Sequence, residues 1–336
     1  MWYNRTHIDC AQDAKKYSEP IEFPPNIEEQ DPKVNVLHLL HMLRHLETLE
    51  IRAGPRYDRG IHTYLSNFLN GRDFSTRLRS FTWWDVDVDI RTLIPALLIP
   101  SVKEVHSSQA SRKDHMDYVW GPDLPQNLQS VSRDGQSNVE RLTLSLVQVD
   151  GLNLSELLRL PRALKVLTYH GGIRYQLADQ PPLRVFKRAL SHVASELEFL
   201  DLFWNSTLPF DDDSTLSFQK FVSLKFLVVN CSLIHDPRSP TNGSLLSESL
   251  PPSLEVLYMY GPYPKIWHRN DILECWKLVL TEKSTTYLPN LWFIGHWNDL
   301  DLLIPFLDLA SSQNVQIALE FQELIRVKEA FLSKIK

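Results

Sequence analysis

The chain has 336 residues, of which 43% are hydrophobic, 10% aromatic and 23% charged, so it carries ample material for a packed core. Its formal net charge of -6 argues against a general phosphate-binding surface, because nucleic-acid-binding domains are usually basic, and we expect no nucleic-acid partner. No apolar stretch approaches the roughly 18 residues of a membrane span, and the start lacks an apolar signal-peptide core, so we expect an intracellular protein, cytoplasmic or nuclear, without a membrane partner.

The first 33 residues differ in composition from the rest of the chain. They contain four prolines and an acidic IEEQD stretch, which favours a partly irregular N-terminal extension over residues 1–33. In the helical pattern that follows, His38, His41 and His45 share one face, a geometry that could hold zinc or copper. Leucines mark the packed stripe of the same helix, so we interpret these histidines as solvent-facing and predict no metal site there.

A short phrase then returns ten times along the chain. It consists of an aliphatic residue, two variable residues, an aliphatic or aromatic residue, one variable residue and usually another apolar one. Its first residues, which we call anchors, recur about 30 residues apart on average, and such a period is typical of a solenoid. The anchors are Leu46, Leu78, Val102, Val139, Leu164, Leu197, Leu224, Leu254, Leu291 and Val315.

The segments between the phrases have a different periodicity. Apolar residues spaced near 3.6 predict helices over residues 93–98, 185–193, 272–280 and 302–310. Prolines follow several of these segments just before the next phrase, where they end a helix and favour extended backbone. Helix, proline and strand therefore alternate along the chain.

The acidic run WWDVDVDI at 83–90 places Asp85, Asp87 and Asp89 at the spacing that begins a calcium loop. The glycine and glutamate that such a loop needs further on are replaced by Ile90 and Ala96. We interpret the last acid as the cap of a helix that starts near Ile90. A metal-dependent enzyme that uses the three aspartates is the alternative function.

Catalytic signatures are missing from the sequence. It contains no GxxxxGK, GxGxxG, GxSxG or HExxH motif, and its cysteines Cys10, Cys231 and Cys275 are too scattered for a disulfide framework or a zinc module. We therefore predict a protein that is not an enzyme and that has no cofactor and no metal site.

The phrase matches the opening LxxLxL of a known motif, and the chain resembles a leucine-rich repeat protein over residues 34–336. The resemblance implies an α/β fold, an irregular leucine-rich repeat solenoid or horseshoe with parallel strands on the concave face and helices on the convex face. It implies one domain of about ten repeats. At the ninth position of the motif only Asn205 is the usual asparagine, so we expect a distorted horseshoe.

Two phrases are preceded by a more specific sequence that begins with Leu-Pro. LPRALKVLTYHGG at 160–172 and LPPSLEVLYMYG at 250–261 look like the repeat regions of filamentous-fungal F-box proteins. That resemblance implies an F-box-like substrate receptor of a ubiquitin ligase. Residues 1–33 contain no F-box, so Skp1 is expected as a partner only if a longer product carries one.

The variable positions of the phrase indicate the binding surface. Because side chains of a strand alternate between faces, the fifth and seventh positions should face the concave side. They are mostly polar in the first repeats and rich in aromatic residues in the later ones. The candidate residues for binding a protein or peptide are Trp84, His170, Phe203, Tyr258, Tyr260 and Trp297.

The aromatic rings at the fifth and seventh positions could also be covered within the chain. The C-terminal helix that ends at Lys336, or strong curvature of the solenoid, could cover the aromatic rings. The apolar third position is interpreted as partly buried between neighbouring repeats; it holds Val166, Phe199, Phe226, Val256 and Phe293. The predicted function is a protein-protein interaction module, with a solenoid inhibitor or a scaffold as a further alternative.

Overall fold

The computed structural model describes residues 47–52, 77–85, 90–109, 134–145, 151–170, 183–203, 216–234, 249–260, 269–284, 287–296, 300–318 and 320–335. The chain divides into two compact units, which are described separately. Unit 1 comprises Met1–Val147 and Leu160–Arg162, and unit 2 comprises Gln148–Arg159 and Ala163–Lys336.

Among its described residues, unit 1 contains four parallel strands that follow one another in chain order, with helix α4 (Ile90–Leu97) between the second and the third. The strands are β1 (Thr48–Arg52), β2 (Ser80–Asp85), β3 (Glu104–Gln109) and β4 (Arg141–Ser145). Their register brings the fifth phrase positions into one row, so Glu50 pairs with Thr82, Thr82 with His106, and His106 with Thr143.

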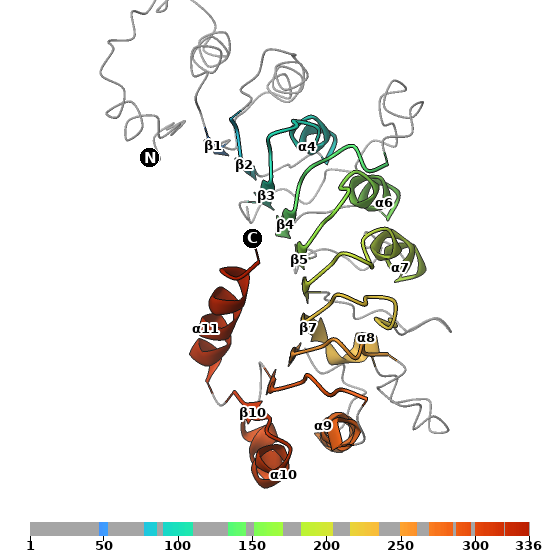
Figure 1. The fold of residues 1–336 in the computed structure, drawn as a ribbon, viewed down its shortest axis with the longest axis vertical. Coiled ribbons are helices and arrows are strands. Elements are labelled where there is room, and N and C mark those ends of the chain that lie inside the picture. Colours follow the sequence, from blue (N-terminus) through green and yellow to red (C-terminus); the bar gives the residue numbers. More distant parts are fainter. Residues whose placement is uncertain are drawn as a thin grey trace, which may run out of the picture. The chain divides into compact units, whose positions relative to one another are not determined.

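Unit 2 contains six parallel strands, again in chain order. They are β5 (Val166–His170), β6 (Phe199–Phe203), β7 (Phe226–Asn230), β8 (Val256–Tyr260), β9 (Phe293–His296) and β10 (Gln316–Ile317). The helices are α6 (Gly151–Arg159), α7 (Leu183–Ser191), α8 (Cys231–Ile234), α9 (Arg269–Ser284), the 3-10 helix η4 (Leu300–Phe306), α10 (Leu307–Ser312) and α11 (Phe321–Leu332). Helices α6, α7 and α9 lie on one side of these strands and α11 lies on the other (Figure 1).

The repeated phrase accounts for this architecture. Each of its ten occurrences overlaps one of the ten described strands; β1 to β9 begin two residues after the anchor, and β10 begins one residue after it. Every anchor from Leu78 to Val315 is buried, because it turns into the core just before its strand starts. The prediction of an α/β leucine-rich repeat solenoid with parallel strands is therefore confirmed.

The helix predictions are confirmed as well. The four apolar runs correspond to α4, α7, α9 and the pair η4–α10. Within the last run the first half is a 3-10 helix that contains Pro305, whose ring is incompatible with a regular α-helical ladder. Helix α4 begins at Ile90, as the acidic run before it indicated.

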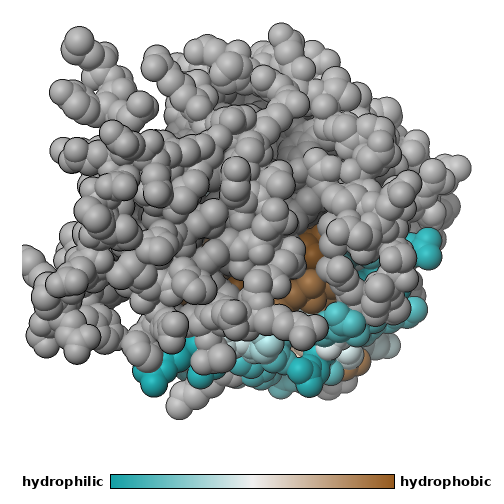
Figure 2. All heavy atoms as spheres, turned by 90° about the horizontal axis from the view of Figure 1, so that it is seen from above, coloured by the Kyte–Doolittle hydropathy of each residue, from teal (hydrophilic) through white to brown (hydrophobic). Residues whose placement is uncertain are grey.

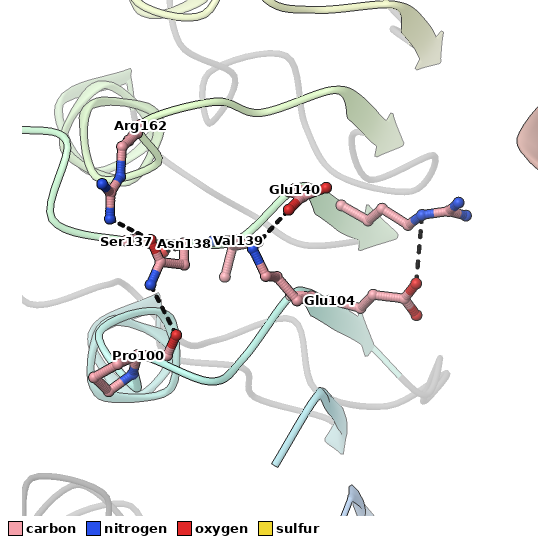
Figure 3. A network of polar contacts seen from close by, with 9 residues as sticks. Pro100, Glu104, Ser137, Asn138, Val139, Glu140 and Arg162 are labelled. Carbon is pink, nitrogen blue, oxygen red and sulfur yellow. Dashed lines mark hydrogen bonds and ion pairs between the residues drawn. The ribbon is translucent and has the colours of Figure 1, made fainter. Parts of the chain in front are cut away.

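Inter-repeat hydrogen bonds form at a position that the sequence analysis did not consider. The residue just before an anchor is asparagine or serine in several repeats, and its side chain donates to a backbone carbonyl of the preceding repeat. In unit 1 Asn138 Nδ2 donates to the Pro100 carbonyl at 2.8 Å (Figure 3). In unit 2 Ser223 Oγ donates to Ser195 at 2.7 Å, Ser253 Oγ to Leu224 at 2.8 Å, and Asn290 Nδ2 to Pro252 at 3.2 Å.

This polar ladder changes the expectation for stacking. The consensus asparagine is replaced at most ninth positions of the motif, yet neighbouring repeats are still joined by side-chain hydrogen bonds at the strand entry. Each such bond contributes about 0.5–1.5 kcal/mol net. Partly buried ion pairs also join neighbouring repeats, with Lys103 2.6 Å from Glu140 in unit 1 and Lys225 3.1 Å from Glu198 in unit 2.

In the view from above, hydrophilic residues predominate along the lower edge of the coloured region, and hydrophobic residues are visible beside them (Figure 2). Large hydrophobic side chains are exposed at several described positions, among them Val222, Tyr287 and Ile304. Among the described helices, none is long and apolar enough to cross a membrane.

Candidate protein-interaction surface

Helix α11 packs on the strands of unit 2. We use the name docking face for the strand residues beneath it, which are Val166, Phe199, Phe226, Val228, Val256, Tyr258, Tyr260 and Phe293. Leu324 and Ile335 are buried in the same cluster, and Val327, Phe331 and Leu332 pack against it while partly exposed. The Phe331 ring centroid lies 5.3 Å from that of Phe226 and 6.3 Å from that of Phe199.

The third phrase position belongs to this docking face. Val166, Phe199, Phe226, Val256 and Phe293 were interpreted as partly buried between neighbouring repeats. They are buried, and the rings of Phe199 and Phe226 on neighbouring strands lie 4.8 Å apart, but the same residues also lie beneath α11, which the sequence did not indicate. A period of two puts the third, fifth and seventh positions on the same side of a strand, so all three face α11. Their consistent apolar character reflects burial beneath a helix.

Tyr258 belongs to the docking face and is fully buried. In the sheet register it is paired with Gly295, and its ring lies over that glycine, where an added Cβ would be only 2.4 Å from two ring carbons. Ala318 is the next neighbour at 3.2 Å. Burial raises the pKa of the Tyr258 phenol, because the charged form would lose its hydration.

Tyr260 is also buried, but it connects the docking face to a partly exposed aromatic ring. Its ring stacks on Phe203 with centroids 4.6 Å apart and an interplanar angle of 7°, and its hydroxyl donates to the Leu202 carbonyl. His170 meets Phe203 edge-on at 5.9 Å. His170 and Phe203 remain partly exposed at the margin of the docking face.

Asp201 provides the charge of this surface. Its carboxylate is only 7% exposed and lies 3.1 Å from Nε2 of His170 and 2.5 Å from Nζ of Lys328 on α11. The Lys328 ammonium also lies 5.6 Å from the centroid of the Phe199 ring. One buried anion is therefore shared between a strand histidine and a helix lysine.

The pKa of Asp201 reflects these contacts. Burial raises it, but the hydrogen bond from His170 and the charge of Lys328 act in the opposite direction, and the net pKa is lowered from 3.8. Asp201 is thus ionised at neutral pH in spite of its burial. A buried carboxylate of this kind requires a cation on the element that covers it.

Unit 1 has a different strand face. Trp84 and His106 come from β2 and β3 with ring centroids 5.1 Å apart, and both are partly exposed. Thr82 and Thr143 flank them and are partly exposed as well. Burial lowers the pKa of His106, and the nearby Glu50 carboxylate partly opposes this effect. The strand face of unit 1 thus combines an aromatic ring with polar side chains.

The candidate binding residues are thus divided. Trp84, His170 and Phe203 are partly exposed, whereas Tyr258 and Tyr260 lie under α11, as the alternative of a covering C-terminal helix expected. The two tyrosines can contact a partner only after α11 has moved. Trp297 lies outside the residues that the structure describes.

The candidate metal ligands receive no support. Within the described ranges no group of three or more histidine, cysteine, aspartate or glutamate side chains could hold a metal ion. Asp85 ends β2, while Asp87 and Asp89 and the three N-terminal histidines lie outside those ranges.

Asp201 and Lys328 were missed as a pair by sequence reasoning. Asp201 occupies a fifth phrase position, at which the two neighbouring repeats have the uncharged residues Thr168 and Val228. Lys328 lies in a C-terminal amphipathic pattern in which Leu324, Val327 and Phe331 mark the apolar side. These two signals together suggest a helix that docks with a cation, although neither identifies the partner of the other.

The chain was compared with protein families, with curated proteins and with solved structures. No protein-family model matches the chain, and no curated protein matches its sequence. Among solved structures it is similar to the leucine-rich repeat-containing protein LegL7 from Legionella pneumophila, with 10% sequence identity, a TM-score of 0.39, and coverage of 88% of this chain and 80% of that one. The strand order and register within each unit, and not this similarity, define the fold.

Proposed function

We propose that the protein is a non-enzymatic protein-binding solenoid whose strand faces contact its partner. The observation that carries this proposal is the aromatic pair of His170 and Phe203, held in place at the margin of the docking face and still partly exposed. Stacking on the buried Tyr260 fixes the Phe203 ring before any partner arrives, so little side-chain entropy is lost on binding.

In unit 1 the partner contacts Trp84, whose ring is positioned against His106. Large aromatic side chains are the residues that most often dominate interface energies, and a partly exposed tryptophan near polar threonines has the mixed character of such an anchor. Trp297 is retained as a candidate contact. Tyr258 and Tyr260 join the surface only when α11 is displaced.

A finer assignment follows from the sequence resemblance. If a longer product carries an F-box, the solenoid selects substrates for a ubiquitin ligase in the cytoplasm or nucleus of a filamentous fungus, with Skp1 as the adaptor. Without an F-box, the same surface serves a solenoid inhibitor or a scaffold. Fold does not distinguish these roles, because function depends on the partner.

Affinity purification of the full chain from its source cells, followed by mass spectrometry, tests this proposal. Trp84→Ala and Phe203→Ala should each reduce recovery of the main partner at least about tenfold, as expected when an aromatic hot spot is removed. Trp292→Ala is the matched control. Trp292 is 40% exposed, but it does not occupy the third, fifth or seventh phrase position, which form the strand faces. Equal recovery with all three variants would refute the proposed surface, and a recovered Skp1 would support the F-box assignment.

A further inference from the structure

The docking face of unit 2 is already occupied by a helix, and that helix shows which chemistry the face accepts. Leu324, Val327 and Phe331 supply apolar contacts at positions i, i+3 and i+7, and Lys328 at i+4 supplies a cation. This is the spacing at which an amphipathic helix presents anchors to a receptor surface. Both the apolar and the charged part of the pattern have partners on the strands.

Several features show that α11 is held mainly by this docking. It has 12 residues, and isolated helices of that length are marginal in water. Its N-cap residue, Glu320, makes no capping hydrogen bond through its side chain. Three of its apolar contact residues are only partly buried, and Ile325 is 38% exposed.

The chain around α11 allows it to leave the sheet without disturbing the strands. Ala318 is fixed to β9, because its backbone N–H donates to the Ile294 carbonyl at 2.8 Å. Helix α11 begins three residues later, at Phe321. Everything from β5 to Ala318 can therefore keep its register while the helix is exchanged.

Exchange must preserve the charge balance at Asp201. The Asp201 carboxylate forms ion pairs with His170 and Lys328, and when Lys328 leaves, the pair with His170 remains. A helix that brought no cation would bury the carboxylate with incomplete compensation, which strongly disfavours binding. The occupant that best fits the face is consequently both apolar and basic.

We infer that the docking face binds, in trans, an amphipathic helix of a partner protein with apolar residues at i, i+3 and i+7 and a lysine or arginine at i+4, and that α11 is the intramolecular competitor of this helix. The inference rests on the proposed function and specifies the class of ligand for the same surface. A partner helix gains access to Tyr258 and Tyr260, which α11 otherwise covers.

The inference is tested with a fluorescent peptide of residues 320–335 and the full chain carrying Lys328→Ala and Phe331→Ala. Fluorescence anisotropy should show saturable binding at least about tenfold tighter than to the wild-type chain, in which α11 competes at a high effective concentration. If the double variant does not fold, the same binding measurement is made with a chain that carries Lys328→Ala alone, which keeps the apolar contacts of α11. Circular dichroism establishes that each variant keeps its secondary structure.

Charge recognition is measured with altered peptides. A Lys328→Arg peptide should bind like the original, and a Lys328→Glu peptide at least about tenfold more weakly, because it places a second anion beside Asp201. In a receptor that also carries Asp201→Asn this discrimination should largely disappear. Equal affinity for the lysine and glutamate peptides would overturn the requirement for a basic residue.

Two further outcomes would overturn the inference as a whole. One is the lack of saturable binding to a folded variant. The other is a concentration-dependent dimer in light scattering, which would identify α11 of a second copy as the occupant. The peptide is derived from the chain itself, so its failure to bind says nothing about partner contacts of Trp84 and Phe203. The proposed function is tested separately, by recovery of the partner with the Trp84→Ala and Phe203→Ala variants.

Discussion

The strand faces of the two units are built from the same phrase positions but have different surroundings. In unit 1 the fifth positions of β1 to β4 hold Glu50, Thr82, His106 and Thr143, and all four side chains are partly exposed. In unit 2 the corresponding positions of β6 to β8 hold Asp201, Val228 and Tyr258, and all three are buried. Helix α11 covers the second set.

This difference shows how a repeat protein can use one backbone pattern for two purposes. Where the inner positions are polar, the surface is stable in water as it stands. Where they are apolar, a covering element is needed, since an exposed apolar patch of several hundred Å² is a site for association. The mutations below test whether the covered face is core or a reversible interface.

Tyr258→Ala should have the largest effect. Removing a fully buried aromatic side chain leaves a cavity, and we expect a loss of about 3–5 kcal/mol in the free energy of unfolding. Urea denaturation followed by circular dichroism measures it, with Tyr287→Ala as the control because Tyr287 is 54% exposed. An unchanged urea midpoint would mean that Tyr258 is an exposed anchor, as the sequence-based candidate list assumed.

Gly295→Ala should have the next largest effect. The added methyl group would lie 2.4 Å from the Tyr258 ring, so the ring must leave its position, at a cost of about 3 kcal/mol for such overpacking. In the background of Tyr258→Ala the same substitution should cost far less, because the obstructing ring is gone. Equal costs in both backgrounds would show that the two residues are not coupled.

Much of this fold is predictable from the sequence, because burial repeats with the phrase. The anchors and the alternation of strand faces specify each strand, and the apolar runs specify α4, α7 and α9. The cover of the docking face is different. An amphipathic helix at the C-terminus carries no information about where it docks, and the Asp201–Lys328 pair joins residues 127 positions apart. Only tertiary packing brings them together.

The inter-repeat ladder was missed for another reason. The consensus motif carries its asparagine at the ninth position, whereas the residues of the ladder, Asn138, Ser223, Ser253 and Asn290, directly precede their anchors. A small polar residue before an aliphatic anchor is common in any chain. Its role becomes visible only when the carbonyl of the preceding repeat lies within hydrogen-bond distance.

Asp201→Asn should destabilise the covered face less than the two core substitutions. It keeps the shape but removes the charge that pairs with Lys328, at an expected cost of about 1–2 kcal/mol at neutral pH. The pH dependence gives a second measure. Because the pKa of Asp201 is lowered from 3.8, its stabilising contribution is complete above that value and is lost as the pH falls toward the folded-state pKa.

Acid denaturation of the two proteins separates this contribution from others. Between about pH 5 and pH 2 the wild type should lose more stability than the Asp201→Asn variant, since the variant has no proton to take up at this position. In unit 1 the strands β3 and β4 carry the ion pair of Arg141 and Glu104, 3.4 Å apart, but both side chains are partly exposed, whereas Asp201 is buried. Parallel acid curves for the two proteins would show that the ion pair does not hold α11.

Ser253→Ala should have the smallest effect and should leave the covered face intact. It removes a hydrogen bond between adjacent repeats at the strand entry, away from α11, and we expect a loss of about 1 kcal/mol or less. Asn138→Ala is the corresponding change in unit 1. Asn138 also donates to a backbone carbonyl of the preceding repeat at 2.8 Å, but its Oδ1 accepts a second hydrogen bond from Arg162, so this variant should lose at least as much stability as Ser253→Ala. Urea denaturation of both variants, combined with anisotropy of the 320–335 peptide, measures the two effects together. Peptide affinity should remain at the wild-type value in each.

If Ser253→Ala instead strengthened peptide binding, stacking of the repeats would be coupled to the position of α11. The docking face could then not be treated as a rigid surface from which the helix is exchanged.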